Sequence, residues 1–136
     1  MARVLIVAHR TAATQKLVEC VRERAARGEC AFTLLVPRPY WDPDTEEAEF
    51  VLELAIPLLE QAAGGHVEGV TGPSDPFEAV REFIAQHPVD EVIVSTLPER
   101  VSRWLHRDLP HRVRELGLEV TVVTASQSDR VHHGAS

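Results

Sequence analysis

Residues 3–8 read RVLIVA, a continuous apolar run that predicts a strand buried on both of its faces. Such strands are typical of the centre of a parallel sheet that helices cover on both sides. Residues 31–37 (AFTLLVP) and 90–95 (DEVIVS) contain similar runs and predict two more buried strands. The sequence therefore predicts an α/β fold with residues 3–8 near the middle of its sheet.

The segments between these runs have the patterns and the ends of helices. Thr14 and either Ser74 or Asp75 are residues that cap helix starts. The predicted helices are 14–27, 45–63, 74–86 and 109–116, and two further strands are predicted at 66–71 and 119–124. Strand and helix alternate without a linker, which predicts one domain over residues 1–125. The polar residues 126–136 are expected to form a disordered tail.

Helix 45–63 is predicted to turn most of its large apolar side chains toward the core. The residues expected on that side are Phe50, Leu52, Leu54, Ala55, Leu58 and Leu59.

Regular crossovers between parallel strands leave two strand orders open, 3-2-1-4-5 and 2-1-3-4-5. The third strand, 66–71 (HVEGVT), alternates between apolar and polar residues. An edge position tolerates polar side chains better than a central one. We therefore expect the order 3-2-1-4-5, with helices on both faces of the sheet.

Composition narrows the function classes. The net charge of −7 argues against a nucleic-acid-binding surface, which needs a broad basic face. The apolar runs are too short for a membrane span or a signal peptide, which predicts a cytoplasmic protein. Cys20 and Cys30 have a spacing that fits neither a zinc site nor a redox motif, so two reduced thiols are expected.

In the order 3-2-1-4-5, a ligand would bind between the first and fourth strands, at their carboxyl ends. The loop after residue 8 offers a cation, hydroxyls and a helix start, which suit an anion, although a plain capped loop explains them equally well. The candidate ligand-binding residues are His9, Arg10, Thr11, Thr14, Pro37, Ser95, Thr96, Arg100, Ser102 and Arg103.

Catalytic and metal sites are not predicted. No serine, cysteine or carboxylate pair has a visible partner, and His106 and His111 lack the spacing of a zinc pair. Tyr40 and Trp41 suit either ring stacking or a contact surface. The acidic residues 42–47 suit the dipole of a first helical turn better than a metal.

The stretch STLPERVSRWLHRDLPHRV, residues 95–113, contains four arginines among apolar side chains. Pro110 fits the first turn of a helix, with Asp108 as its cap, so a short turn is expected at 101–107 before helix 109–116. Arg103 and Arg107 lie four residues apart and would share one side of that turn. They suit an anion, or pairing with nearby acidic side chains.

The element order over residues 2–124, and above all the runs 88–96 and 108–123, resemble the universal stress protein family. The resemblance implies a Rossmann-like fold, and many members bind ATP. Members commonly pair through the last strand, which implies a homodimer through Val120, Val122 and Val123.

The ATP pattern of that family is absent from this sequence. His9, Arg10 and Thr11 stand where the family has an aspartate loop, and no glycine occurs between Gly72 and Gly117. Glycines there let backbone N–H groups approach phosphates closely. We therefore expect the family's fold without its standard ATP site.

Three functions stay open at this point. The first is a non-enzymatic stress-response or regulatory domain, dimeric and without a certain cofactor. The second is a binder of a nucleotide or another small anion in the crevice between the first and fourth strands. The third is an enzyme of the wider fold, against which the missing acid–base pair counts.

Overall fold

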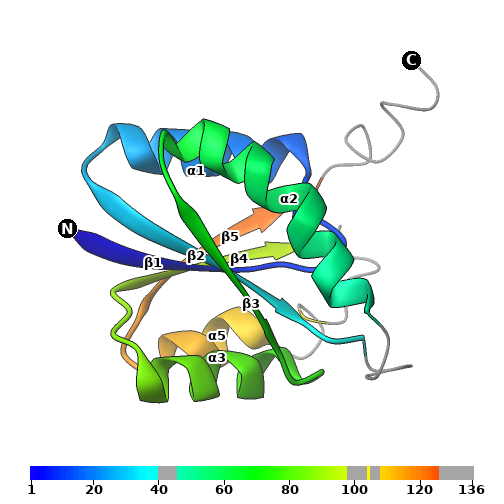
Figure 1. Ribbon diagram of the computed structural model, residues 1–136. Coiled ribbons are helices and arrows are strands. Elements are labelled where there is room, and N and C mark those ends of the chain that lie inside the picture. The colour runs from blue at the N-terminus through cyan, green and yellow to red at the C-terminus, as the bar shows by residue number, and fades with distance from the viewer. Residues whose placement is uncertain (40–45, 98–103, 105–107, 126–136) are drawn as a thin grey trace.

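The computed structural model of the chain describes residues 1–39, 46–97, 104 and 108–125. Five parallel strands form one sheet in the order β3-β2-β1-β4-β5 (Figure 1). The predicted order is therefore confirmed and 2-1-3-4-5 is excluded. The elements are β1 Ala2–Val7, α1 Gln15–Ala26, β2 Cys30–Pro37, α2 Glu47–Ala63, β3 Val67–Gly72, α3 Pro76–Gln86, β4 Glu91–Thr96, α5 Leu109–Arg114 and β5 Glu119–Thr124.

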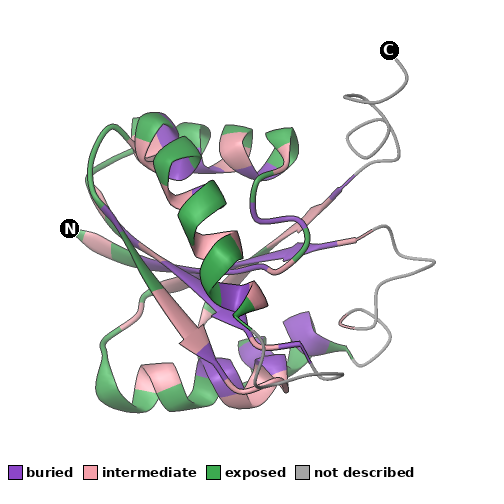
Figure 2. Ribbon diagram, turned by 45° about the vertical axis from the view of Figure 1, so that its right-hand side comes forward, coloured by how far each residue is buried: buried purple, intermediate pink, exposed green. Residues whose placement is uncertain are grey.

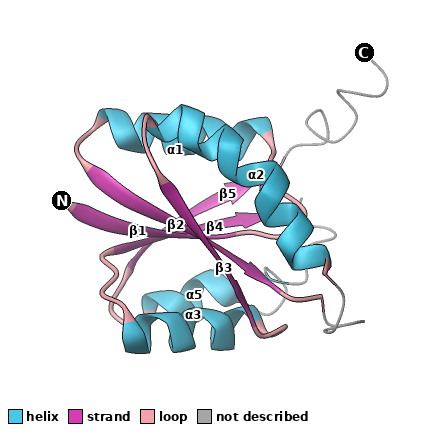
Figure 3. Cartoon of the chain, in the orientation of Figure 1, coloured by secondary structure: helices cyan, strands magenta, loops and turns pink. Residues whose placement is uncertain are grey.

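The helices form two layers, one on each face of the sheet. Figures 1 and 3 show α1 and α2 above the sheet and α3 and α5 below it. Each face of the sheet has its own hydrophobic core, and alternate β1 side chains pack into each. Val4 and Ile6 pack toward α1 and α2, and Leu5 and Val7 pack toward α3 and α5. The apolar run at residues 3–8 is needed because both faces of β1 are covered.

Two predicted helix caps are confirmed. The Thr14 hydroxyl accepts a hydrogen bond from the backbone N–H of Leu17 at 3.4 Å. The Asp75 carboxylate accepts from the N–H groups of Phe77 at 2.9 Å and Glu78 at 3.4 Å, so Asp75 rather than Ser74 caps α3. Each cap satisfies backbone donors that the first helical turn leaves without a partner.

The prediction for the core side of α2 is wrong for three of its six residues. Phe50, Leu54 and Leu58 are 57%, 72% and 42% exposed. The side chains that α2 buries are mostly small: Ala48, Ala55, Leu59 and Ala62. Apolar residues of α2 occur around most of its circumference, so the sequence pattern alone could not identify the buried side. Small side chains there bring α2 close to the sheet and leave the larger ones outside.

The close approach of α2 is visible at Gly69 of β3. A Cβ at this position would lie 3.0 Å from Leu52 Cδ2 and 3.2 Å from Ile56 Cδ1. Leu52 is thus confirmed as a core-facing residue, packed against the α1–α2 side of the sheet.

The prediction that Asp108 caps α5 with its side chain is also wrong. Asp108 stands at the N-cap position with φ 57° and ψ 40°, and its carboxylate makes no capping hydrogen bond. A side-chain cap needs an extended backbone at this residue, whereas Asp108 is left-handed. Pro110 does lie in the first turn of α5, as predicted.

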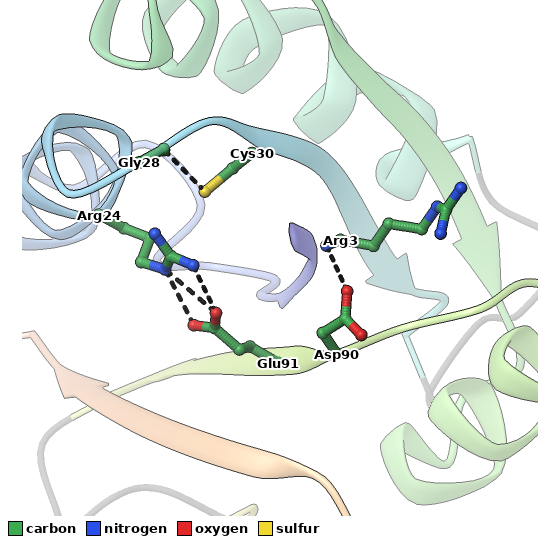
Figure 4. Close-up of polar contacts among 6 residues, drawn as sticks. All are labelled: Arg3, Arg24, Gly28, Cys30, Asp90 and Glu91. Carbon is green, nitrogen blue, oxygen red and sulfur yellow. Dashed lines mark hydrogen bonds and ion pairs between the residues drawn. The ribbon is translucent and has the colours of Figure 1, made fainter. Parts of the chain in front are cut away.

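A partly buried ion pair joins α1 to β4 at the amino end of the sheet (Figure 4). Arg24 donates to both Glu91 carboxylate oxygens, with Nη2 to Oε2 at 2.6 Å and Nε to Oε1 at 3.0 Å. This hydrogen-bonded pairing lowers the pKa of Glu91 and raises that of Arg24. Beside it, the backbone N–H of Arg3 donates to Asp90 at 2.8 Å.

Cys20 and Cys30 are free thiols, both partly buried against the core on the α1 side. The Cys30 thiol lies 3.3 Å from the Gly28 carbonyl oxygen (Figure 4). Burial raises the pKa of Cys20, which keeps it protonated and unreactive near neutral pH. Among the described residues, no helix has the length and apolar character that a membrane span requires.

Candidate functional site

The carboxyl ends of β1 and β4 lie side by side in the sheet, since Val7 pairs with Val94. This neighbourhood brings the loop after β1 against the last residues of β4. The Thr11 Oγ1 and Ser95 Oγ atoms are 2.6 Å apart, and either hydroxyl can be the donor. The structure therefore joins two predicted site residues that are 84 positions apart in the sequence.

Both hydroxyls lie in the interior, because Thr11 is 2% and Ser95 1% exposed. A buried hydroxyl without a partner costs free energy, and this pair satisfies both groups at once. The Thr11–Ser95 pair thus lies in the interior between the β1 loop and β4, and it presents little surface of its own to a ligand.

Thr14 uses its side chain within the same loop. Its hydroxyl donates to the Thr11 carbonyl oxygen at 2.9 Å and accepts from the N–H of Leu17. The N-terminus of α1 is one of the places where an anion could bind. Here the protein's own threonine already occupies one of its donors.

Thr96 and Pro37, two further predicted site residues, are also buried. The Thr96 hydroxyl lies 3.5 Å from Thr124 Oγ1, and the Thr96 carbonyl accepts from the Ala125 N–H at 2.8 Å. These bonds hold the end of β4 against β5. Pro37 ends β2 in register with Gly72 of β3.

The β1 loop also contains His9, which is half-buried with its Nε2 atom shielded from solvent, and Arg10, which is exposed. Burial is the main cause that lowers the pKa of His9, and nearby Arg10 lowers it further against the opposing effect of Glu47. His9 is therefore neutral near pH 7. Arg10 is left as the cation of this loop, and Glu47 contributes negative charge nearby, so the local field favours an anion only weakly.

The remaining predicted site residues, Arg100, Ser102 and Arg103, lie outside the described residues, as do Tyr40, Trp41 and the acidic residues 42–44. From the turn at 101–107 the structure describes Trp104, which is partly buried against the core on the α3–α5 side. The described ranges contain no cluster of three or more His, Cys, Asp or Glu side chains that could hold a metal ion.

Comparison of the fold with known proteins adds a family likeness. No protein-family model and no curated protein matches the sequence. A universal stress protein from Archaeoglobus fulgidus superposes with a TM-score of 0.66 at 12% identity, covering 90% of this chain and 93% of that one. The chain has the fold of universal stress proteins.

Two further universal stress protein structures show the same fold, and both contain nucleotides. One, in complex with cAMP, has a TM-score of 0.65 at 15% identity, with 92% and 98% of the two chains covered. The other, from Archaeoglobus fulgidus in complex with dAMP, has a TM-score of 0.56 at 13% identity, with 93% and 98% covered. At sequence identities this low, the similarity concerns the fold alone.

Within this universal stress protein fold, a further cluster of polar side chains lies beside the end of α2, and the sequence had not predicted it. The His66 ring bridges two carboxylates, with Nδ1 3.2 Å from Glu60 Oε2 and Nε2 3.2 Å from Glu68 Oε2. The bond to Glu68 is the largest cause that raises the pKa of His66. A shallow depression lined by Pro57, Glu60, Gln61, Gly65 and His66 lies here. Glu60 and His66 lie on either side of the Gly64-Gly65 turn, and this spacing is the sequence feature that could have predicted their contact.

Proposed function

We propose that this chain is a non-enzymatic regulatory domain with the universal stress protein fold, acting in the stress response through protein contacts and lacking the standard ATP site. The observation that carries the proposal is the buried hydrogen bond between Thr11 and Ser95. These hydroxyls stand where the topology would place a ligand, and they satisfy each other instead.

The glycine content of the chain supports the same proposal. Between Gly72 and Gly117 no glycine is available to bring backbone N–H groups close to a polyphosphate. Asp108 occupies the start of α5, and its carboxylate would repel phosphate groups. A bound triphosphate would therefore lack its cradle on the β4 side of the crevice.

A second candidate is the binding of a small anionic ligand or a nucleotide between β1 and β4. It is favoured by the two similar structures determined with cAMP and dAMP. In this chain Arg10, Arg100 and Arg103 would supply the positive charge, and bidentate arginine contacts suit phosphate well.

The test is a thermal-shift titration of the full chain with ATP, cAMP and dAMP, with and without Mg²⁺, followed by calorimetry. A ligand that binds only the folded state adds about 2.7 kcal/mol of stability at a hundredfold excess over its Kd. We expect no saturable shift at millimolar nucleotide. The second candidate would replace the first if a nucleotide gave a saturable shift and its binding free energy fell by about 1.5–3 kcal/mol in Arg103→Ala. The control Arg22→Ala, on α1, should leave that binding free energy unchanged.

We further propose that the chain forms a homodimer through β5 and works in the cytoplasm without a nucleic-acid partner. β5 is an edge strand of the described sheet, and Val120, Val122 and Val123 on it are partly exposed. The two free thiols suit a reducing compartment, and the net charge of −7 would repel nucleic acid.

A further inference from the structure

The outer side of α2 carries an unusual exposed apolar surface. Of the five large hydrophobic side chains exposed in the described part of the chain, Phe50, Leu54 and Leu58 all belong to this helix. Their spacing of four residues places them in one row along it. Figure 2 shows exposed residues along α2, on the side that faces away from the sheet. Below, this row is called the α2 ridge.

The α2 ridge is accompanied by negative charge. Glu46, Glu49 and Glu53 are exposed, and their spacing of three and four residues puts them along one side of the helix beside the ridge. Residues 46–63 contain five glutamates and no lysine, arginine or histidine. Among the described residues, an ion pair on this side joins Glu49 to Arg38 at 3.7 Å, a long and exposed contact.

The helix dipole accounts for part of this charge and for none of the apolar exposure. Glutamates in a first turn are favourable, and Glu47 and Glu49 lie there. Glu53 lies beyond that turn. Exposed leucine and phenylalanine in one row are a sign of a contact surface, since isolated exposed apolar residues are ordinary and clustered ones are not.

We propose that the α2 ridge is a docking surface for a basic amphipathic helix of a partner protein. Such a helix would pack its apolar side on Phe50, Leu54 and Leu58, a row about 12 Å long. Its lysines or arginines would lie against Glu46, Glu49 and Glu53. The apolar contacts would supply the affinity, and the charges the orientation and association rate. This proposal does not rest on the function proposed above.

Charge complementarity decides against the other occupants. A second copy that packed its own α2 here would offer these glutamates no basic side chain, because a two-fold interface uses the same patch twice and residues 46–63 contain no lysine, arginine or histidine. An anionic membrane surface would repel the glutamates. Within the chain, residues 126–136 contain one arginine and one aspartate and no large apolar side chain except Val131. Trp104 of the arginine-rich stretch packs on the opposite face of the sheet.

The experiment measures fluorescence anisotropy of a labelled 14-residue leucine–lysine peptide with an amphipathic helical pattern, titrated with the full chain. A scrambled peptide of the same composition is the matched probe. We expect the amphipathic peptide, but not the scrambled one, to bind the wild-type chain saturably. The amphipathic peptide should bind the Leu54→Gln variant about tenfold more weakly. The control, Leu116→Gln, removes an exposed leucine outside α2 and should stay within about twofold.

A second pair of variants tests the charge. Glu53→Gln should reduce both the affinity and its salt dependence, whereas Glu82→Gln, an exposed glutamate of α3 on the other face, should change neither. The proposal would be overturned if the two glutamate variants had equal effects, or if the scrambled peptide bound as tightly as the amphipathic one. Either result would indicate a general attraction of basic peptides to an acidic protein.

Two further outcomes would also overturn it. If sedimentation shows a wild-type dimer that Leu54→Gln dissociates, the occupant is a second copy. If Leu54→Gln abolishes cosedimentation with anionic lipid vesicles, the occupant is a membrane. Because Leu54 is 72% exposed, the glutamine variant should fold normally, which circular dichroism checks.

Discussion

The hydroxyl pair of Thr11 and Ser95 joins the two central strands at the point where the topology reverses. Both groups are buried, so each depends on the other for its hydrogen bond. Replacing one residue leaves the other without a partner, whereas replacing both removes the need. The two substitutions are therefore expected to be strongly non-additive.

We expect Thr11→Val to lower the free energy of unfolding by about 1–3 kcal/mol, because the Ser95 hydroxyl stays buried without a partner. Ser95→Ala should have a similar effect, and the double variant should lose less than the sum of the two. Urea denaturation measures all three, with Gln86→Ala at the exposed end of α3 as the control. Simple additivity would show that the hydrogen bond contributes nothing.

Asp108 is the one residue other than glycine with a positive φ in the described chain. We expect Asp108→Gly to keep or raise the free energy of unfolding, since glycine adopts this conformation without steric cost. Asp108→Val should lower it by about 1–2 kcal/mol, because a β-branched residue fits poorly there. Thermal and urea unfolding of the two variants would contradict this if their stabilities were equal.

At the scale of elements, α3 packs on β3 across a glycine. A Cβ at Gly72 would lie 2.9 Å from Ala79 Cβ, closer than two such atoms normally approach. Gly72→Ala should therefore lower the free energy of unfolding by about 1–3 kcal/mol through overpacking. Gly28→Ala is the control, since nothing lies within 4 Å of its added methyl group. Equal urea midpoints for the two variants would show that α3 can move aside freely.

The ion pair of Arg24 and Glu91 makes the attachment of α1 to β4 dependent on pH. Arg24 lowers the folded-state pKa of Glu91 below its usual value of 4.5, so the pair's contribution is present above that value. It is lost as the pH falls through the folded pKa. We expect Glu91→Gln to be less stable than the wild type at pH 7 and nearly equal to it in acid, as urea midpoints across pH would show. A difference that stays constant with pH would contradict this.

At the scale of the whole molecule, the dimer proposal makes a prediction about β5. Sedimentation equilibrium should give twice the chain mass, and Val122→Lys should give a monomer, since a charged side chain blocks pairing at a sheet edge. Leu116→Lys, a change outside the sheet, is the control. A wild-type monomer at micromolar concentration would exclude β5 as a stable interface.

The order of the strands could be predicted because sequence polarity follows burial in a parallel sheet. Residues 4–8 are apolar on both faces and β1 is central, whereas residues 66–71 alternate and β3 is an edge. The caps at Thr14 and Asp75 could be predicted because they depend on neighbouring residues alone.

Other features depend on tertiary contacts and could not be predicted. Tertiary packing decides which side of α2 is buried. The helix buries mostly small side chains, whereas Phe50, Leu54 and Leu58, which the helical pattern placed on the core side, are exposed. For the site, the strand order brought the first and fourth strands together as expected. It gave no sign that Thr11 and Ser95 would satisfy each other, because a residue's hydrogen-bond partner 84 positions away leaves no local signal.

The central place of β1 also has a consequence for the newly synthesised chain. Backbone contacts between β1 and the β4 end join residues 87 positions apart, so one side of β1 stays open until most of the chain has left the ribosome. At translation rates of about 5–20 residues per second, that delay is about 4–17 seconds. During that time Val4, Ile6 and their neighbours form an unpaired strand edge. Nascent chains of this protein are therefore expected to engage chaperones until β4 is made.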